Sequence, residues 1–438
     1  MLRTIVIIIS LFVFTSQAWS AERLLLRLHG SNTIGAELAP ALLKRWLAHE
    51  GYTEITQQRL AAEEMMIRAV SKQGETVGVL VKAHGSTTSF KGLLAGEADI
   101  GMASRPIKEK EVAALASLGR MDAPDSEFVL GLDGIAVIVH PDNPLVQLNK
   151  ETLRKVFAGE VRDWSELGAG SGPIHVYARD DKSGTYDTFK SLVLSKQAPL
   201  RADARRFESN AILSDEVAAD PNGIGFVGLP YIRDSKALAV MDGGQAAILP
   251  DAFTVATEDY ALARRLFLYL PASAGNQTAR DFIKFAISST GQQVVAETGF
   301  ISQEIVTGTG LASGMTHEEY RALTEGAQRL SLNFRFHRGS AELDNKARED
   351  IRRLLEYIDR EGARQRELIL VGFSDQHEAI PLHSLALSIH RADRVADILI
   401  SNGLAPRRVR GFGPAVTVAA NDTRQGREKN RRVEVWLR

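Results

Sequence analysis

A short polar stretch near the middle of the chain, YARDDKSGTYDTF, contains the residue types that bind anions. Arg179 is followed four positions later by Ser183, Gly184 and Thr185. A guanidinium offers a planar fork of donors that matches the oxygens of a phosphate or carboxylate. Hydroxyls add further donors, and glycine lets the backbone approach a ligand closely. An ordinary polar turn ahead of a helix has a similar composition, so the rest of the sequence must decide between the two.

Two more loops share this design, HGSNTIG at 29–35 and AHGSTTSF at 83–90. In each, a strand-like segment runs into Gly, Ser and Thr, and a helix-like segment follows. The first N–H groups of a helix have no partner within the helix and carry partial positive charge, which favours an anion. A single Ser or Thr before a helix is usually only an N-cap. Three such loops in one domain, one of them with an arginine, favour a shared anion site.

The elements around these loops alternate between strand and helix. Residues 22–110 predict strands and helices in turn, which is typical of a mostly parallel α/β sheet. An apolar strand is expected at 128–140 and an amphipathic helix at 149–160, with Leu153, Val156 and Phe157 on one face. Residues 173–179 then form the strand that leads into the Arg179 motif.

Composition and charge divide the chain. Its 438 residues are 44% hydrophobic and 24% charged, as in soluble globular proteins of two to four domains. Residues 326–438 contain 21 Lys and Arg against 15 Asp and Glu, a net charge of +6 within a chain of net charge −1. Residues 301–325 are rich in Gly, Ser and Thr and predict a linker. We therefore expect an α/β domain at 22–300 and a compact α+β domain at 326–438, in which Asp344 caps a helix.

The first residues predict export. Arg3 precedes an apolar run at 5–14, and Ala18 and Ser20 supply the small residues of a cleavage site, so 1–20 has the pattern of a signal peptide. An uncleaved membrane anchor is the alternative. The chain has no cysteine, which excludes disulfides, thiolate metal sites and a lipid-modified cysteine. These features predict a soluble exported protein.

Six motifs occur in the order found in one known family: GSNTIG, HGST, LLAGEADIGMASRPI, LDGIAVIVHPDNPLVQLNKETLRKVFAGEVRDWSELG, RDDKSGTYDTF and GIGFVGLPY. Residues 24–300 resemble the PstS-like periplasmic phosphate-binding proteins of ABC-type uptake systems. The resemblance implies a two-lobed periplasmic-binding-protein fold of type II, in which a hinged cleft closes on one tetrahedral oxyanion. It also implies inorganic phosphate as the ligand, an ABC permease as a partner, and neither a cofactor nor catalysis.

The resemblance assigns eight residues to phosphate and a ninth to orienting the arginine: Thr33, the Ile34 backbone, Ser86, Asp99, Arg179, Ser183, Gly184 and Thr185, with Asp181 beside Arg179. Asp99 is the unusual member, because a carboxylate repels an anion unless the ligand brings a proton. Phosphate carries a proton near neutral pH and sulfate does not. An acceptor left unpaired by sulfate would cost about 1–3 kcal/mol. Asn32 and the threonines of GSTTS depart from the family pattern and would narrow the cleft or change the oxyanion.

Residues 330–438 resemble the OmpA-like peptidoglycan-binding domain, through ILVGFSD, LALSIHRADRVADILISNGL and NDTRQGREKNRRVEV. The resemblance implies that Asp375 meets the ammonium of a peptidoglycan diaminopimelate, that Arg391 meets its carboxylate and that Arg431 supports the site. The segment SDQHEAIPLHSLALS departs from the family, since it lacks the loop glycine and contains Pro381. In the alternative, Asp375 and Arg391 form only an internal ion pair.

The leading hypothesis is a periplasmic, cell-wall-associated binding protein for phosphate uptake or sensing. A structural cell-envelope protein with a vestigial or different oxyanion site is the alternative. A serine hydrolase using Ser183 is disfavoured, because no G-x-S-x-G motif surrounds it. His377, His383 and His390 lack the spacing of metal ligands, so no metal site is predicted. Export also disfavours nucleic acid as a partner.

Overall fold

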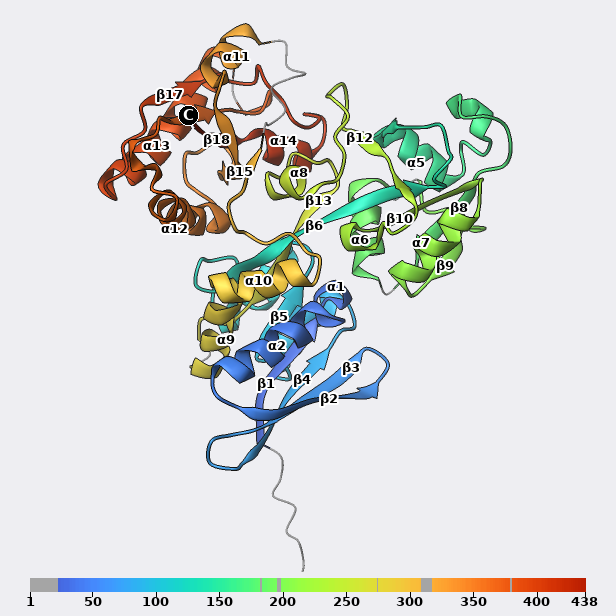
Figure 1. Cartoon of the computed structure of the whole chain (residues 1–438), viewed down its shortest axis with the longest axis vertical. Helices are drawn as coiled ribbons and strands as arrows, with labels where there is room; N and C mark the ends of the chain where they lie inside the picture. Colours follow the sequence, from blue (N-terminus) through green and yellow to red (C-terminus); the bar gives the residue numbers. More distant parts are fainter. Residues whose placement is uncertain (1–22, 182, 195–197, 274, 309–316, 379) are drawn as a thin grey trace, which may run out of the picture.

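The structure is a computed structural model that describes residues 23–438 except 182, 195–197, 274, 309–316 and 379. The expected signal peptide at 1–20 lies outside the described residues. Figure 1 shows three parts, two lobes and a C-terminal domain, and each has its own hydrophobic core. Across the described ranges, no helix is both long and apolar enough to cross a bilayer.

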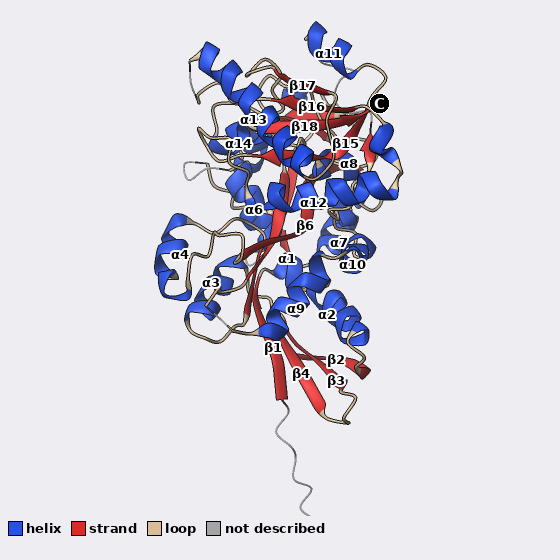
Figure 2. Cartoon of the chain, turned by 90° about the vertical axis from the view of Figure 1, so that its left-hand side faces the viewer, coloured by secondary structure: helices blue, strands red, loops and turns tan. Residues whose placement is uncertain are grey.

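Lobe 1 is built on the first half of a long mixed sheet with the strand order β2-β3-β4-β1-β5-β13-β6. Its strands are β1 (Arg23–Gly30), β2 (Thr53–Ala61), β3 (Glu64–Val70), β4 (Thr76–Lys82), β5 (Ile100–Ala103) and β13 (Ala263–Tyr269). Helices cover both faces of this sheet (Figure 2): α2 (Leu38–His49), α9 (Gln277–Ile287) and α10 (Ser289–Glu297) on one, and α3 (Ser86–Leu94) and α4 (Glu109–Ala114) on the other. The short helix α1 (Asn32–Gly35) follows β1 directly.

One long strand connects the two lobes. Strand β6 (Glu127–Val139) pairs through its first half with β13, and through its second half with β10 (Gly223–Gly228) of lobe 2. Its side chains from Val129 onward are buried, which explains the apolar run. The strand predicted at 128–140 is thus confirmed, and it runs from one lobe into the other.

Lobe 2 continues the sheet in the order β10-β8-β9. Its elements are β7 (Gln147–Asn149), α5 (Lys150–Ala158), β8 (His175–Arg179), α6 (Gly184–Leu192), β9 (Arg205–Phe207), α7 (Asn210–Ala219), β11 (Lys236–Ala237), β12 (Ala239–Met241) and α8 (Ala252–Ala256). Helix α5 shows how sequence sets these bounds. The Asn149 side chain accepts the Thr152 N–H, and Gly159 ends the helix with a φ of 80°. Between them, Leu153, Val156 and Phe157 are buried as the periodicity predicts.

The sheet is mixed, which corrects the expectation of a mostly parallel one. Strand β1 runs parallel to β4 and β5, but β2, β3 and β4 form an antiparallel series, and β13 is antiparallel to both its neighbours. The reason is chain connectivity. Short turns join β2 to β3 and β3 to β4, and strands joined by a short turn must run antiparallel.

The C-terminal domain has a five-stranded sheet of order β14-β15-β18-β16-β17. Its strands are β14 (Thr307–Gly308), β15 (Gln328–Arg335), β16 (Leu368–Gly372), β17 (Arg408–Gly411) and β18 (Arg432–Leu437). Its helices are α11 (Glu318–Thr324), α12 (Asn345–Arg360), α13 (Pro381–Ser401) and α14 (Arg424–Asn430). The Asp344 side chain accepts the Ala347 N–H at 2.8 Å, which confirms the predicted cap of α12.

The C-terminal domain is packed against lobe 1 and the residues before β13. Arg329 and Asp259 form an ion pair of 2.7 Å across this seam, with 1% of each side chain exposed. Arg265 of β13 pairs with Asp344 at 2.7 Å, and Asn333 donates to the Thr257 carbonyl at 2.6 Å. Buried pairs of this kind fix the orientation of the two parts, because separating them would leave charges unpaired.

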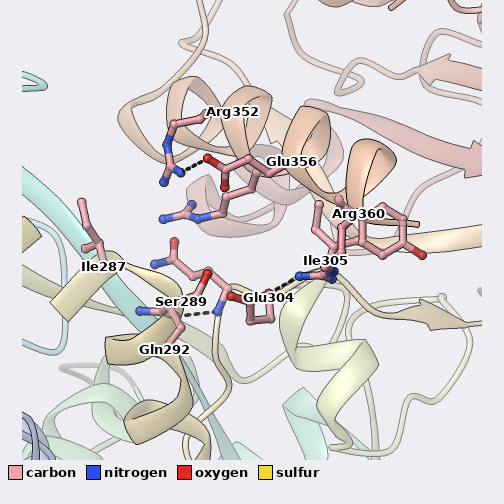
Figure 3. Close-up of a pocket in the computed structure, with 11 residues that line it drawn as sticks. Ile287, Ser289, Gln292, Glu304, Ile305, Arg352, Glu356 and Arg360 are labelled. Carbon is pink, nitrogen blue, oxygen red and sulfur yellow. Dashed lines mark hydrogen bonds and ion pairs between the residues drawn. The ribbon is translucent and has the colours of Figure 1, made fainter. Parts of the chain in front are cut away.

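The expected linker at 301–325 is therefore part of the seam where the structure describes it. Ile301 bridges to Leu132, the Gln303 N–H donates to the Gln292 side chain at 2.7 Å, and β14 joins the C-terminal sheet. A cavity of about 190 Å³ lies beside this segment, between α10 and α12. Figure 3 shows it with the Arg360–Glu304 ion pair of 3.3 Å across one end. Residues 301–308 are thus not a free spacer.

Candidate functional site

Three loops from both lobes meet around Gly184, the first residue of α6. A Cβ atom at this position would lie 2.7 Å from Thr33 Oγ1, 3.0 Å from Ser104 Oγ and 3.4 Å from Ser31 Oγ. Ser31 and Thr33 follow β1, and Ser104 follows β5, so lobe 1 supplies the hydroxyls and lobe 2 supplies the helix N-terminus. Only glycine permits an approach this close. We call Ser31, Thr33, Ser104, Gly184 and Arg264 the polar cluster.

The second predicted loop joins the polar cluster through Ser104. The Ser86 hydroxyl accepts the Ser104 N–H at 3.0 Å and lies 3.2 Å from the Ser104 hydroxyl. Ser86 is buried. Ser183 caps α6 by accepting the Tyr186 N–H at 3.3 Å, which is the structural role considered for it. Ile34 has its side chain in the core of lobe 1, so only its backbone belongs near the loop.

A buried arginine that the sequence did not single out connects the loops. Arg264 of β13 donates to the Gly184 carbonyl and to Thr188 Oγ1, each at 2.6 Å, and lies 3.3 Å from Thr33 Oγ1. Its charge is balanced by Asp133 of β6, with Nη2 2.5 Å from Oδ2. The sequence does contain a signal for this pair, since a charged residue stands inside each of two apolar strands. The two residues are 131 positions apart, however, so the sequence does not show that they are partners.

Arg179 is also buried, with 4% of the residue exposed. Its Nε donates to the Phe207 carbonyl at 3.2 Å, and its Nη2 donates to the Glu208 carbonyl at 2.5 Å. Burial lowers the pKa of the guanidinium from its ordinary value, and the charge of Arg264 acts in the same direction. An anion placed here would relieve this cost.

Arg179 lines a cavity of about 40 Å³ with Thr33 of the polar cluster and with Thr185, Asp133, Asn210 and Tyr231. Three buried side-chain atoms at this place have no hydrogen-bond partner within the described part of the chain: Ser31 Oγ, Asp133 Oδ1 and Asn210 Oδ1. Buried polar groups are nearly always paired, and each unpaired one costs about 1–3 kcal/mol. Their concentration beside two arginines indicates a site built for a polar ligand.

Asp99 does not belong to this site. Its carboxylate accepts the Arg27 N–H at 2.8 Å and pairs with the Arg27 guanidinium at 3.0 Å. Asp99 precedes the four-residue strand β5 and Ser104 follows it, so five steps along the chain separate them by roughly 16 Å. The cluster lies at the carboxyl ends of β1 and β5, which is where ligands bind in such sheets. The assignment of Asp99 from the resemblance is corrected on this ground.

Asp181 is likewise not the partner of Arg179. It pairs with Arg206 at 2.6 Å, and 86% of its side chain is exposed. Backbone carbonyls, rather than a carboxylate at this position, orient the Arg179 guanidinium. The turn after β8 directs the Asp181 side chain to solvent.

The three residues expected to bind wall peptide lie together in the C-terminal domain, but they have internal partners. Asp375 pairs with Arg431 at 3.0 Å. Arg391 donates two parallel hydrogen bonds, of 2.6 and 2.7 Å, to the carboxylate of Glu378. Asp375 and Arg391 are therefore not partners of each other. Glu378, in the segment that departs from the family pattern, was missed by the sequence analysis. We call these four residues the charge network.

Comparisons with known proteins agree with this architecture. A family model described as PBP superfamily domain matches residues 54–290, and one described as OmpA family matches residues 335–431. Protein SphX of Synechococcus elongatus is 31% identical over 250 residues, which are 54% of this chain and 73% of SphX. Phosphate-binding protein PstS of Borreliella burgdorferi is 28% identical over 247 residues, 55% of this chain and 84% of that protein. The crystal structure of an ABC-type phosphate transport receptor from Vibrio cholerae has a TM-score of 0.50 at 23% identity, covers 63% of this chain and 99% of the receptor, and shows a shared fold.

Proposed function

Because the chain belongs to the PBP superfamily and carries an OmpA-family domain, we propose that it is an exported solute-binding protein that captures phosphate between its two lobes. A relative named as a phosphate-binding protein, aligned over 84% of its own length, supports this choice of ligand. The proposed compartment is the periplasm, where the protein would serve phosphate uptake or sensing. An ABC permease is the expected partner for uptake.

One observation carries the proposal: buried polar atoms without partners gather where three anion-type loops and two arginines converge. A tetrahedral anion offers four oxygens in different directions. The Thr33, Ser31 and Ser104 hydroxyls and the N-terminus of α6 would take oxygens from one side, and Arg179 from the other. Full desolvation of the ion is then compensated by fixed donors, which is the physical requirement for tight binding.

Asp133, rather than Asp99, is the carboxylate that would accept a proton from the ligand and so distinguish phosphate from sulfate. Its Oδ1 is a buried acceptor with no donor in the described part of the chain, while its Oδ2 holds Arg264. A ligand that carries a proton satisfies Oδ1, whereas a fully ionised one meets a carboxylate without compensation. We therefore expect phosphate and arsenate to bind and sulfate to be rejected.

We infer binding rather than catalysis. The Ser183 hydroxyl is used as the cap of α6, and the sequence around Ser183 lacks the glycine pattern of a nucleophile elbow. The residues around the small cavity supply donors together with the acceptor oxygens of Glu37, Asp133 and Asn210, which suits recognition of a proton-bearing ion.

For the C-terminal domain we propose a tether to peptidoglycan through the region of Asp375, Arg391 and Arg431. The match to the OmpA family over residues 335–431 supports this role. The seam would then hold the phosphate-binding lobes close to the wall, since it fixes the domain to lobe 1.

Isothermal titration calorimetry of the purified chain with phosphate, arsenate and sulfate tests the proposal. We expect saturable phosphate binding with one ion per chain, and sulfate at least 10-fold weaker. Absence of phosphate and arsenate binding would overturn the function and leave the alternative of a structural envelope protein. Equal affinity for sulfate would instead reject the selective role of Asp133.

A further inference from the structure

Arg391, the arginine expected to hold a wall-peptide carboxylate, already holds a carboxylate of the chain itself. Its Nη1 and Nη2 donate to the two oxygens of Glu378 at 2.7 and 2.6 Å, and its Nε donates to the Ser340 carbonyl at 3.0 Å. Neither the Arg391 nor the Glu378 side chain has any exposed surface. This bidentate arrangement is the one that arginine offers to carboxylate ligands.

Glu378 is held by backbone donors as well. Its Oε1 accepts the Gly339 N–H at 2.9 Å, and its Oε2 lies 3.4 Å from the Asp375 N–H. Burial alone would raise the pKa of this carboxyl group, but the hydrogen bonds and charge of Arg391 outweigh it and hold the pKa below the ordinary value. Glu378 is therefore ionised at neutral pH and fills the position fully.

The second carboxylate of the charge network is also paired, although Arg431 Nε has no hydrogen-bond partner in the described part of the chain. Asp375 Oδ2 pairs with Arg431 Nη1 at 3.0 Å, and Asp375 Oδ1 accepts the His377 N–H at 2.7 Å. Two carboxylates thus balance two guanidinium groups within a buried site. A zwitterionic ligand can meet Arg391 only if the Glu378 side chain leaves it.

We propose that Glu378 determines the specificity of this site, by holding Arg391 as an internal substitute for the carboxylate of the wall peptide. The inference rests on the proposed wall-binding function and deepens it. The native domain gains no affinity from a diaminopimelate carboxylate, because that carboxylate must compete for Arg391 with the Glu378 carboxylate of the same chain. Removing the charge of Glu378 exposes Arg391 to the ligand, and binding then depends on the ligand carboxylate.

The test compares the full chain with Glu378→Gln and Glu378→Asp in co-sedimentation with purified diaminopimelate-type sacculi. Glu342→Gln is the matched control, because Glu342 belongs to the same domain, is paired with Arg348 at 2.9 Å and has 63% of its side chain exposed. We expect Glu378→Gln to bind sacculi at least 10-fold more tightly than the native chain, and Glu378→Asp to remain nearer to native because it keeps the charge. Glu342→Gln should leave binding within twofold.

A second arm uses sacculi in which the diaminopimelate carboxylate is amidated. Amidation should reduce binding of Glu378→Gln at least fivefold and leave native binding within twofold, since only the variant offers Arg391 to that group. Thermal melts of each variant report whether it is folded. If Glu378→Gln proves unfolded, the binding of Glu378→Asp to the two kinds of sacculi is compared with that of the native chain instead.

The outcomes separate the two claims. If the native chain and Glu378→Gln bind free-acid sacculi equally tightly, the role of Glu378 is overturned and the wall tether stands. If amidation weakens native binding as much as that of the variant, the role of Glu378 is likewise overturned. If no chain binds sacculi, the wall tether itself fails and the inference fails with it.

Discussion

The polar cluster between the lobes and the charge network of the C-terminal domain are both buried and both contain arginine, yet the carboxylates beside these arginines differ in how completely they are paired. The cluster has unpaired atoms, Ser31 Oγ and Asp133 Oδ1 among them. In the charge network, each carboxylate is paired with an arginine of the same chain. A buried acceptor without a donor indicates a site prepared for a ligand, whereas a carboxylate paired within the chain stabilises the fold and must be displaced before a ligand can take its place. Matching motif residues therefore do not by themselves define a binding site.

The largest effect is expected where a member of the closed network is removed. Asp375→Ala leaves Arg431 buried without its carboxylate, and we expect the free energy of unfolding to fall by about 3–5 kcal/mol. Urea denaturation of the ligand-free chain measures this change. Asp393→Ala, at an exposed position of α13, is the control and should change it by less than about 0.5 kcal/mol. A loss at Asp375 as small as that of the control would contradict a stabilising network.

In the polar cluster, the largest effect is expected on affinity. Arg179→Ala removes the buried guanidinium that faces the small cavity, and we expect phosphate affinity to fall by on the order of 100-fold or more, about 3 kcal/mol. Calorimetry measures the change. Arg206→Ala tests the neighbouring exposed ion pair with Asp181 and should stay within twofold. Retained affinity in the Arg179 variant would show that the ligand binds elsewhere.

A smaller effect is expected on selectivity, and it separates the two aspartates. Asp133→Asn removes the charge that opposes a fully ionised anion, so the preference for phosphate over sulfate should fall by about 10-fold, or 1.4 kcal/mol. Asp99→Asn should leave this preference unchanged, because the Asp99 carboxylate is paired with Arg27 away from the cluster. Competition binding of both anions gives the ratio. Loss of selectivity in the Asp99 variant alone would restore the assignment made from the motif.

The smallest effect is expected for Ser31→Ala, which distinguishes a loss of phosphate affinity from a loss of stability. Ser31 Oγ has no hydrogen-bond partner in the described part of the chain, so Ser31→Ala should not lower the stability of the ligand-free protein. Phosphate affinity should still fall by about fivefold, or 1 kcal/mol, because one donor to the ion is lost. Thermal melts with and without phosphate separate the two quantities. A loss of ligand-free stability would mean that Ser31 is structural.

Local patterns predicted most of the elements and the three anion loops, because strand and helix periodicity and Gly-Ser-Thr turns are short-range signals. They also brought Thr33, Gly184 and Arg179 to one place, and the family resemblance is confirmed by the comparisons. Arg264 and Asp133 were not predicted as site residues. Each lies inside an apolar strand, and its role becomes visible only from its ion pair with the other, 131 residues away.

Two errors have a physical cause that sequence spacing hides. Asp99 lies on the correct strand but at its amino end, and a motif does not show on which edge of the sheet a residue falls. Glu378 pairs with Arg391 across 13 positions, and nothing in the residues around Glu378 indicates that pairing.

Neighbouring residues of β13 point in opposite directions: Arg264 reaches the polar cluster, and Arg265 reaches Asp344 at the start of α12. In the described part of the chain, the hydrogen bonds and ion pairs of the C-terminal domain to the lobes go to lobe 1 and to residues 257–265. Wherever that domain is anchored, lobe 1 is anchored with it. The same contact also reaches lobe 2, because Tyr260 and Ala261, whose carbonyls accept hydrogen bonds from Lys429, pack in the core of that lobe, so any change in the angle between the lobes must be accommodated at residues 257–265.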